Sequence, residues 1–248
     1  MSTLDNGNRP DVQDQVAKLF EGTPTEADMI VSLPSQGHFY QNKQATVTIT
    51  PIKFEDEKQI SITLKNNDNP LSYILQRCIK DFPVNNLLLL DKQYLLLKIR
   101  EISYGSEYPV EVTCPKCGFE HSIKINLGDL LVNEISKDLT DPRTIKLPKL
   151  KKDVEVRFPR VSDEQWLTTE NSIFQNLWRF ILKINGNSDP VFIAEVIKKL
   201  HVMDVKFIMH NITRTDLGLN PQFELDCSKC SRISKINVPI NENFFLVT

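Results

Sequence analysis

The chain has 248 residues, of which 40% are hydrophobic and 25% are charged, and its 30 basic and 32 acidic residues leave a formal net charge of -2. This composition predicts a globular protein with one large core or two small ones, and it excludes a wholly disordered chain. The small net charge excludes an overall electrostatic field for nucleic acid or for an anionic membrane, so any such binding would be local.

Residues 1–28 are polar and are expected to form a flexible N-terminal arm. Apolar residues at helical spacing after Asp11 indicate a short helix that docks onto a partner, or else a partly ordered tail. These candidate docking residues are Val12, Val16, Leu19 and Phe20. The arm has neither the charged start nor the apolar run of a signal peptide, and no segment has the roughly 20 apolar residues of a membrane span. A reducing cytoplasm is therefore expected.

Residues 29–109 are expected to form an N-terminal β/α region. The segment over 31–40 is turned by Pro34 and Gly37, and two later segments alternate as strands do. Two further segments have the 3.6-residue period of a helix, and Gly105 ends the second of them. The expected strands are 46–50 and 59–64, and the expected helices are 71–80 and 91–102.

Residues 110–128 and 221–248 are expected to form one β-hairpin module that is similar to a zinc ribbon. Each part reads as a strand, a Cys-x-x-Cys knuckle and a second strand: EVTCPKC is followed by IKIN, and ELDCSKC is followed by SKIN. Gly118, after the first pair, accepts the backbone twist of a knuckle, whereas Ser231 makes the second pair a weaker signal. The four cysteines are Cys114, Cys117, Cys227 and Cys230.

Residues 129–220 are expected to be a mainly helical insertion between the two parts of this module. Residues 129–143 are expected to be helical up to the break at Asp141-Pro142, and a strand is expected over 153–158. Three helices are expected to follow, with their starts at the capping box of Ser162, at Pro190 and near Asp204. The apolar face expected for the first of these helices is Ile173, Leu177, Phe180, Ile181 and Ile184. The aromatic residues expected in the core are Trp166, Phe174 and Trp178.

Two Cys-x-x-Cys turns supply the four thiolate ligands that a structural Zn²⁺ ion takes in a tetrahedral site. The sequence therefore predicts one zinc ion shared by both turns. A thioredoxin-like redox pair is the rival interpretation, but it requires a helix at its first cysteine, and strands are expected after both pairs. Cys78 is expected to be a small buried hydrophobe. His121 is expected to stay off the metal because four thiolates already saturate it.

Four thiolates leave no open position for water or substrate, so the predicted zinc is structural and an enzyme is not expected. The sequence also lacks a phosphate-binding loop and the H-E-x-x-H and G-x-S-x-G motifs. A basic stretch between Lys146 and Arg160 is the best argument for a zinc-ribbon nucleic-acid-binding function. Prolines and leucines interrupt this stretch and the whole chain is slightly acidic, so specific nucleic-acid binding is not expected.

The segment LPSQGHFY, from Leu33 to Tyr40, resembles the LPS-x-G-x-x-Y signature near the start of T4-like bacteriophage baseplate proteins. Those proteins have a similar length and carry cysteine-pair knuckles at comparable places. The resemblance covers most of the chain, whereas the insertion carries no matching motif. Within the signature, Leu33, Pro34, Gly37 and Tyr40 are either a docking element or an ordinary turn at the entry to a strand.

This resemblance implies a baseplate hub assembly protein, similar to the hub assembly catalyst or to its sister hub assembly protein. The implied role is a non-enzymatic, chaperone-like assembly factor that binds hub and/or tape-measure proteins in the host cytoplasm. The alternative is a zinc-ribbon nucleic-acid-binding or host-directed regulatory protein. The pattern of elements by itself predicts the α+β class, with the hairpin module split by the insertion and preceded by the β/α region.

Overall fold

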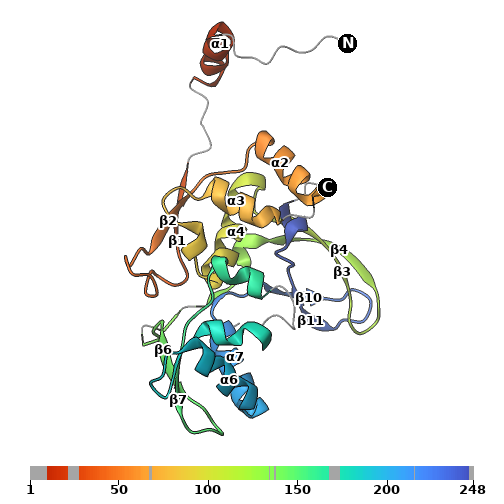
Figure 1. The fold of residues 1–248 in the computed structure, drawn as a ribbon. Helices are drawn as coiled ribbons and strands as arrows, with labels where there is room; N and C mark the ends of the chain where they lie inside the picture. The colour runs from red at the N-terminus through yellow and green to blue at the C-terminus, as the bar shows by residue number, and fades with distance from the viewer. Residues whose placement is uncertain are drawn as a thin grey trace.

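Two separate hydrophobic clusters organise the α+β fold, which is the class expected from the sequence. The computed structural model describes residues 10–21, 28–66, 69–133, 135–136, 138–167, 174–214 and 216–245. The larger cluster includes residues from Val31 to Phe245 and so joins strand β1 (Met29–Ser32) to the C-terminal end of the described chain, whereas the smaller one lies between Ile145 and Ile212. Figure 1 shows the helices and the small antiparallel sheets that carry these clusters.

The larger cluster is built around helix α4 (Leu89–Tyr104), which lies among the other elements in Figure 1. Three consecutive leucines of this helix, Leu95 to Leu97, are at most 1% exposed, so α4 is buried on more than one face. The neighbouring elements are β1 (Met29–Ser32), β2 (Thr46–Ile49), α2 (Phe54–Lys65), α3 (Pro70–Cys78) and η1 (Val84–Asn86). The first expected strand and both expected helices of this region are confirmed.

A helix replaces the strand expected over 59–64, so that expectation is wrong. Ile60 and Ile62 alternate with polar residues, but both lie in α2, whose first turn is acidic. The Asp56 Oδ2 atom accepts a 2.9 Å hydrogen bond from the backbone N–H of Lys53 and so caps this first turn. The side chain of Ile60 is 1% exposed, whereas that of Ile62 is 40% exposed. The apolar–polar alternation over 59–64 was too short to predict a strand against the acidic, capped first turn of α2.

Two antiparallel hairpins carry the cysteine pairs at their tips, as the repeated pattern predicts. The first consists of β3 (Glu107–Thr113) and β4 (Glu120–Asn126), and the second of β10 (Gln222–Asp226) and β11 (Ile233–Asn237). Both ribbons extend toward the same side of the molecule in Figure 1. Their tips meet although the contacting cysteines lie 110 and 116 residues apart in the sequence.

The segment between the hairpins contains strands as well as helices. Its antiparallel pairings join β5 (Val132–Asn133) to β9 (Gly218–Leu219), and β6 (Arg143–Lys146) through β7 (Asp153–Val156) to β8 (Ile181–Ile184). Helices α6 (Pro190–Lys199) and α7 (Val202–Thr213) contact the three-stranded sheet and contribute to the smaller cluster. The strand expected over 153–158 and the last two expected helices are confirmed. The remaining described 3₁₀ helices are η2 (Leu127–Asp129), η3 (Val161–Trp166), η4 (Leu177–Phe180) and η5 (Glu242–Phe245).

The helix expected over 129–143 is wrong. The described residues of this segment instead comprise the end of η2, strand β5, the first residue of β6 and the turns between them. Some of their backbone partners are distant in sequence: the Asn220 N–H donates a 2.8 Å hydrogen bond to the Leu131 carbonyl, beside the β5–β9 pairing. A segment whose backbone groups find such partners does not need the helical ladder.

The α-helix expected from Ser162 is wrong over residues 162–167. The described residues there form the short 3₁₀ helix η3, and its cap is the Asp163 carboxylate, which accepts the Arg160 N–H at 2.8 Å. Residues 174–176 are helical. Residues 168–173, which include Ile173, lie outside the described residues. Of the expected apolar face, Leu177 and Phe180 lie in η4, whereas Ile181 and Ile184 lie in β8; all four are buried. Pairing with β7 therefore decides the conformation of the last two.

The three aromatic residues of this segment differ in burial. Phe174 is 55% exposed, so the core position expected for it is wrong. Trp166 and Trp178 are partly buried, and the guanidinium carbon of Arg179 lies 3.9 and 4.4 Å from their ring centroids. Trp178 also packs against the smaller cluster. Trp178 thus combines apolar packing with a cation–π contact, and Trp166 makes a cation–π contact with the same arginine.

Helix α1 (Pro10–Phe20) is drawn apart from the other elements in Figure 1. Its Val12, Val16 and Leu19 side chains are 39%, 49% and 73% exposed, so the expected helix is confirmed and its docking role stays a prediction. The side chain of Phe20, and the parts of the expected arm over 1–9 and 22–27, lie outside the described residues. Among the described residues, no helix is both long and apolar enough to cross a membrane.

Candidate metal centre

Four cysteine sulfur atoms lie together between the tips of the two hairpins. The Sγ atoms of Cys114, Cys117, Cys227 and Cys230 are all within 4.8 Å of one another. Across the two hairpins, the Cys114–Cys230 and Cys117–Cys227 sulfur distances are 3.8 and 3.6 Å. Zinc–sulfur bonds of about 2.3 Å in a tetrahedron place the sulfur atoms about 3.8 Å apart. The four ligands predicted from the sequence therefore have the spacing of one tetrathiolate site, and they fit a zinc ion.

The same backbone turn forms both knuckles. In the first, the Gly118 N–H donates to the Cys114 carbonyl at 3.0 Å, and in the second the Ser231 N–H donates to the Cys227 carbonyl at 2.7 Å. Both donors have left-handed backbone angles, with φ of 69° for Gly118 and 52° for Ser231. Ser231 thus adopts a conformation that costs a non-glycine residue about 1 to 2 kcal/mol. The second pair, although weaker in sequence, forms an equivalent knuckle.

The surroundings of the cluster shift the pKa values of Cys114 and Cys230 in opposite directions. Hydrogen bonds from the backbone N–H groups of Cys117 and Lys116 lower the pKa of Cys114 to about 6. Burial raises the pKa of Cys230 to about 11. Metal binding requires all four cysteines as thiolates, so a bound zinc ion would release the protons that the metal-free cluster retains.

The remaining cysteine does not belong to the cluster. Cys78 lies in α3 within the larger hydrophobic cluster, is 0% exposed, and has a pKa raised to about 12 by burial. It is a buried thiol, as expected. Strands β4 and β11 follow the two Cys-x-x-Cys turns, so neither turn has the helix that a thioredoxin-like redox pair requires.

The signature from Leu33 to Tyr40 forms a buried turn. The two end residues are 2% and 5% exposed, so their side chains belong to the core, and their docking role stays a prediction. Asp91 of α4 holds the turn: its carboxylate accepts the Ser35 N–H at 2.9 Å and the Tyr40 hydroxyl at 2.7 Å. Sequence reasoning missed Asp91 because its partners lie 51 and 56 residues away, and no local motif marks it.

Ion pairs partly neutralise the basic stretch between Lys146 and Arg160. Arg157 donates to both carboxylate oxygens of Asp163, at 2.7 and 2.9 Å. Arg160 lies 3.3 Å from the Asp141 carboxylate and also donates to backbone carbonyls. These two arginines therefore join elements of the fold, and they contribute less to a positive surface than the sequence suggests.

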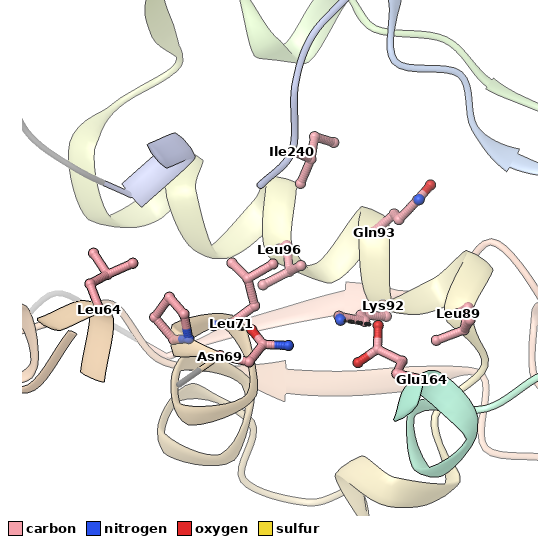
Figure 2. A pocket seen from close by; sticks show the side chains of 10 residues that line it. Leu64, Asn69, Leu71, Leu89, Lys92, Gln93, Leu96, Glu164 and Ile240 are labelled. Atoms are coloured by element: carbon pink, nitrogen blue, oxygen red, sulfur yellow. Dashed lines mark hydrogen bonds and ion pairs between the residues drawn. The ribbon is translucent and has the colours of Figure 1, made fainter. Parts of the chain in front are cut away.

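A cavity of about 500 Å³ lies beside α3, α4 and η3 (Figure 2). Leucine side chains of the helices line it, together with Ile240 and an ion pair between the Lys92 Nζ atom and the Glu164 carboxylate. Lys92 is 5% exposed, and Figure 2 shows both charged groups turned toward each other. The pair joins α4 to η3, so its charges already have partners.

A protein-family model described as "T4 bacteriophage base plate protein" matches residues 26–246. The match spans the signature turn, both hairpins and the insertion between them. The chain belongs to this family. The resemblance predicted from the signature and the cysteine pairs is thereby confirmed. As a T4-type base plate protein, the chain has a baseplate-related role, and family membership implies interaction with other baseplate proteins. No curated protein and no solved structure matches the chain.

Proposed function

We propose that this T4-type base plate protein is a non-enzymatic assembly factor for the baseplate hub, stabilised by one structural zinc ion. The family match over residues 26–246 supports the baseplate role. The sulfur geometry supports the zinc. Four thiolates would complete the coordination of the ion and leave no position for a substrate, which favours a binding function over a catalytic one.

In this proposal the zinc ion fastens together two hairpins that are remote in sequence. Each hairpin is a two-stranded ribbon, and isolated two-stranded ribbons are marginally stable in water. Metal ligation at the tips would therefore stabilise both ribbons and the chain that connects them. Each of the four cysteines acts as a ligand, and the ion supplies structural cross-linking when it is bound.

The proposed partners are hub and/or tape-measure proteins, which the protein holds in an assembly-competent state in the host cytoplasm. Helix α1 is the proposed docking element because its apolar stripe of Val12, Val16 and Leu19 is exposed. An amphipathic helix of this kind binds by laying its apolar face into a groove of the partner. The helix supplies binding surface without an active site, as an assembly factor requires.

Elemental analysis of the purified protein tests the zinc. One zinc ion per chain is expected. Cys114→Ser should lose the metal and fold poorly, because structural zinc contributes about 10 kcal/mol or more to folding. Cys78→Ser is the matched control and should keep the metal, since that thiol lies in the hydrophobic core. A folded wild-type protein without zinc, or one with two zinc ions, contradicts the shared site.

Co-expression with each hub and tape-measure protein of the same phage, followed by affinity capture, tests the assembly role. The full chain should capture at least one of them, and a chain without residues 1–28 should capture less. A Val12→Ser/Val16→Ser/Leu19→Ser variant should reproduce that loss, whereas Asp14→Ser/Lys18→Ser should not, because it leaves the apolar stripe and the net charge unchanged. If the full chain captures none, and hubs assemble completely without it, the assembly role is wrong.

A further inference from the structure

A histidine lies beside the four sulfur atoms and connects the two hairpins. His121 belongs to β4 of the first hairpin, and its Nε2 atom lies 3.3 Å from the Sγ atom of Cys227 in the second knuckle. A metal-bound cysteine is a thiolate, which has no proton to donate. In the metal-loaded protein, the hydrogen in this contact must therefore come from the histidine, with the Nε2–H as donor.

Aromatic packing holds the imidazole in this position. The Phe119 ring packs edge-on against the His121 ring, with 4.9 Å between the two centroids. The Lys229 Nζ atom, from the second knuckle, lies 5.6 Å from the centroid of the same Phe119 ring. Two contacts therefore join the second knuckle to the first hairpin: Lys229 contacts Phe119, and Cys227 contacts His121. The imidazole of His121 is thus held by the Phe119 ring and by its contact with the Cys227 sulfur.

The geometry does not make His121 a fifth ligand. The set of potential ligand atoms within 4.8 Å of one another, among the described residues, consists of the four cysteine sulfurs and does not include the imidazole nitrogen. Four thiolates fill a tetrahedral zinc site. They also give a zinc complex a formal charge of -2, so a hydrogen-bond donor at one sulfur is electrostatically favourable.

We propose that His121 is a positioning residue that donates its Nε2–H to the Cys227 thiolate and preorganises the second knuckle for metal. This inference rests on the proposed zinc site. The bond crosses between hairpins, so it helps to bring the second pair of ligands against the first. Hydrogen-bond partners outside the ligand shell orient ligands in this way, and their removal typically lowers metal affinity by about 10 to 100-fold.

Zinc competition against a chromophoric chelator tests the proposal on the full-length chain. His121→Ala should bind zinc about 10 to 100-fold more weakly than the wild type. His121→Gln, which restores an N–H donor, should recover part of that loss. His210→Ala, at an exposed position on α7, is the matched control and should leave the affinity unchanged. Circular dichroism at saturating zinc shows whether each variant is folded.

Cobalt substitution separates positioning from ligation. The visible spectrum of the Co²⁺ protein should indicate four thiolates in both the wild type and His121→Ala. A wild-type spectrum with a nitrogen ligand that disappears in the variant would overturn the outer-shell role, as would equal zinc affinities for the two proteins. Failure of the wild type to bind zinc would overturn both this inference and the zinc site, so the two failures are distinguishable.

Discussion

The buried contact between Tyr40 and Asp91 gives a quantitative test of what holds the signature turn. Tyr40→Phe removes one hydroxyl that makes two buried hydrogen bonds: it donates to the Asp91 carboxylate at 2.7 Å and accepts the Leu88 N–H at 3.0 Å. Tyr40 is 5% exposed and Asp91 is 0% exposed, so water cannot readily replace either bond. The ring itself keeps its edge-on contact with Phe82.

The expected loss is about 3 to 5 kcal/mol. A hydrogen bond to a charged group contributes about 1.5 to 3 kcal/mol, and an unsatisfied buried N–H costs about 1 to 3 kcal/mol. For a chain of this length, each kcal/mol lowers the melting temperature by roughly 2 to 4 °C, so Tyr40→Phe should lower it by about 6 °C or more. Burial raises the pKa of Asp91, and the hydrogen bonds from Ser35 and Tyr40 oppose that rise.

The pH dependence of this loss has a definite sign. The hydroxyl of Tyr40 favours the ionised form of Asp91, so its removal should raise the pKa of Asp91 further. The stability difference between wild type and variant should therefore be largest where Asp91 is ionised, and it should shrink as falling pH protonates Asp91.

Thermal and urea unfolding of Tyr40→Phe should be compared with Tyr94→Phe. Tyr94 lies on the same helix as Asp91 and is partly buried, and its hydroxyl makes no hydrogen bond to the described part of the chain. This control should change stability by less than about 0.5 kcal/mol. Equal effects of the two substitutions, or a loss below about 1 kcal/mol for Tyr40→Phe, would refute the reasoning.

Two further predictions concern the backbone turn at Gly37 and the contribution of Asp163 to stability in acid. Gly37→Ala should destabilise the protein more than Gly186→Ala in urea unfolding. Both glycines have left-handed angles, but an added Cβ at Gly37 would lie 2.6 Å from a backbone carbonyl, whereas Gly186 has open space. Burial raises the pKa of Asp163, but the hydrogen bonds and positive charges of Arg157 and Arg160 together outweigh burial and lower the pKa, so the stability from this carboxylate should be lost as pH falls below about 4. The difference in urea midpoint between wild type and Asp163→Asn should accordingly narrow between pH 7 and pH 3, and a constant difference would contradict the pairing.

Local signals in the sequence determined several elements. Asn69 and Asp189 each precede a proline, and each side chain accepts a backbone N–H of the following first turn, at 3.0 and 2.9 Å. Such caps depend on residues two positions apart, so a sequence shows them directly. The two cysteine knuckles could also be predicted from the sequence, because each is a turn of a few residues between alternating segments.

Contacts between distant segments determined what the sequence left open. Ile181 and Ile184 have a spacing that also suits a helix, and only their pairing with β7 makes them a strand. Asp91 looks like an ordinary helical aspartate until the fold places Ser35 and Tyr40 against it. Hydrophobic periodicity in the sequence indicates partners only within a few residues. The β7–β8 pairing and the hydrogen bonds of Asp91 depend instead on how the fold places segments that are distant in sequence.

Part of the metal centre could be predicted from the local sequence, and part was decided by the tertiary structure. The sequence by itself supplied the four cysteines, because the ligand type and the two-residue gap are written locally. Only the tertiary structure decided that the two pairs meet, with cross-hairpin sulfur distances of 3.8 and 3.6 Å, and that His121 faces Cys227. The physical reason is that a knuckle forms from its own backbone turn, whereas a four-ligand site requires the chain between the knuckles to fold and bring them together.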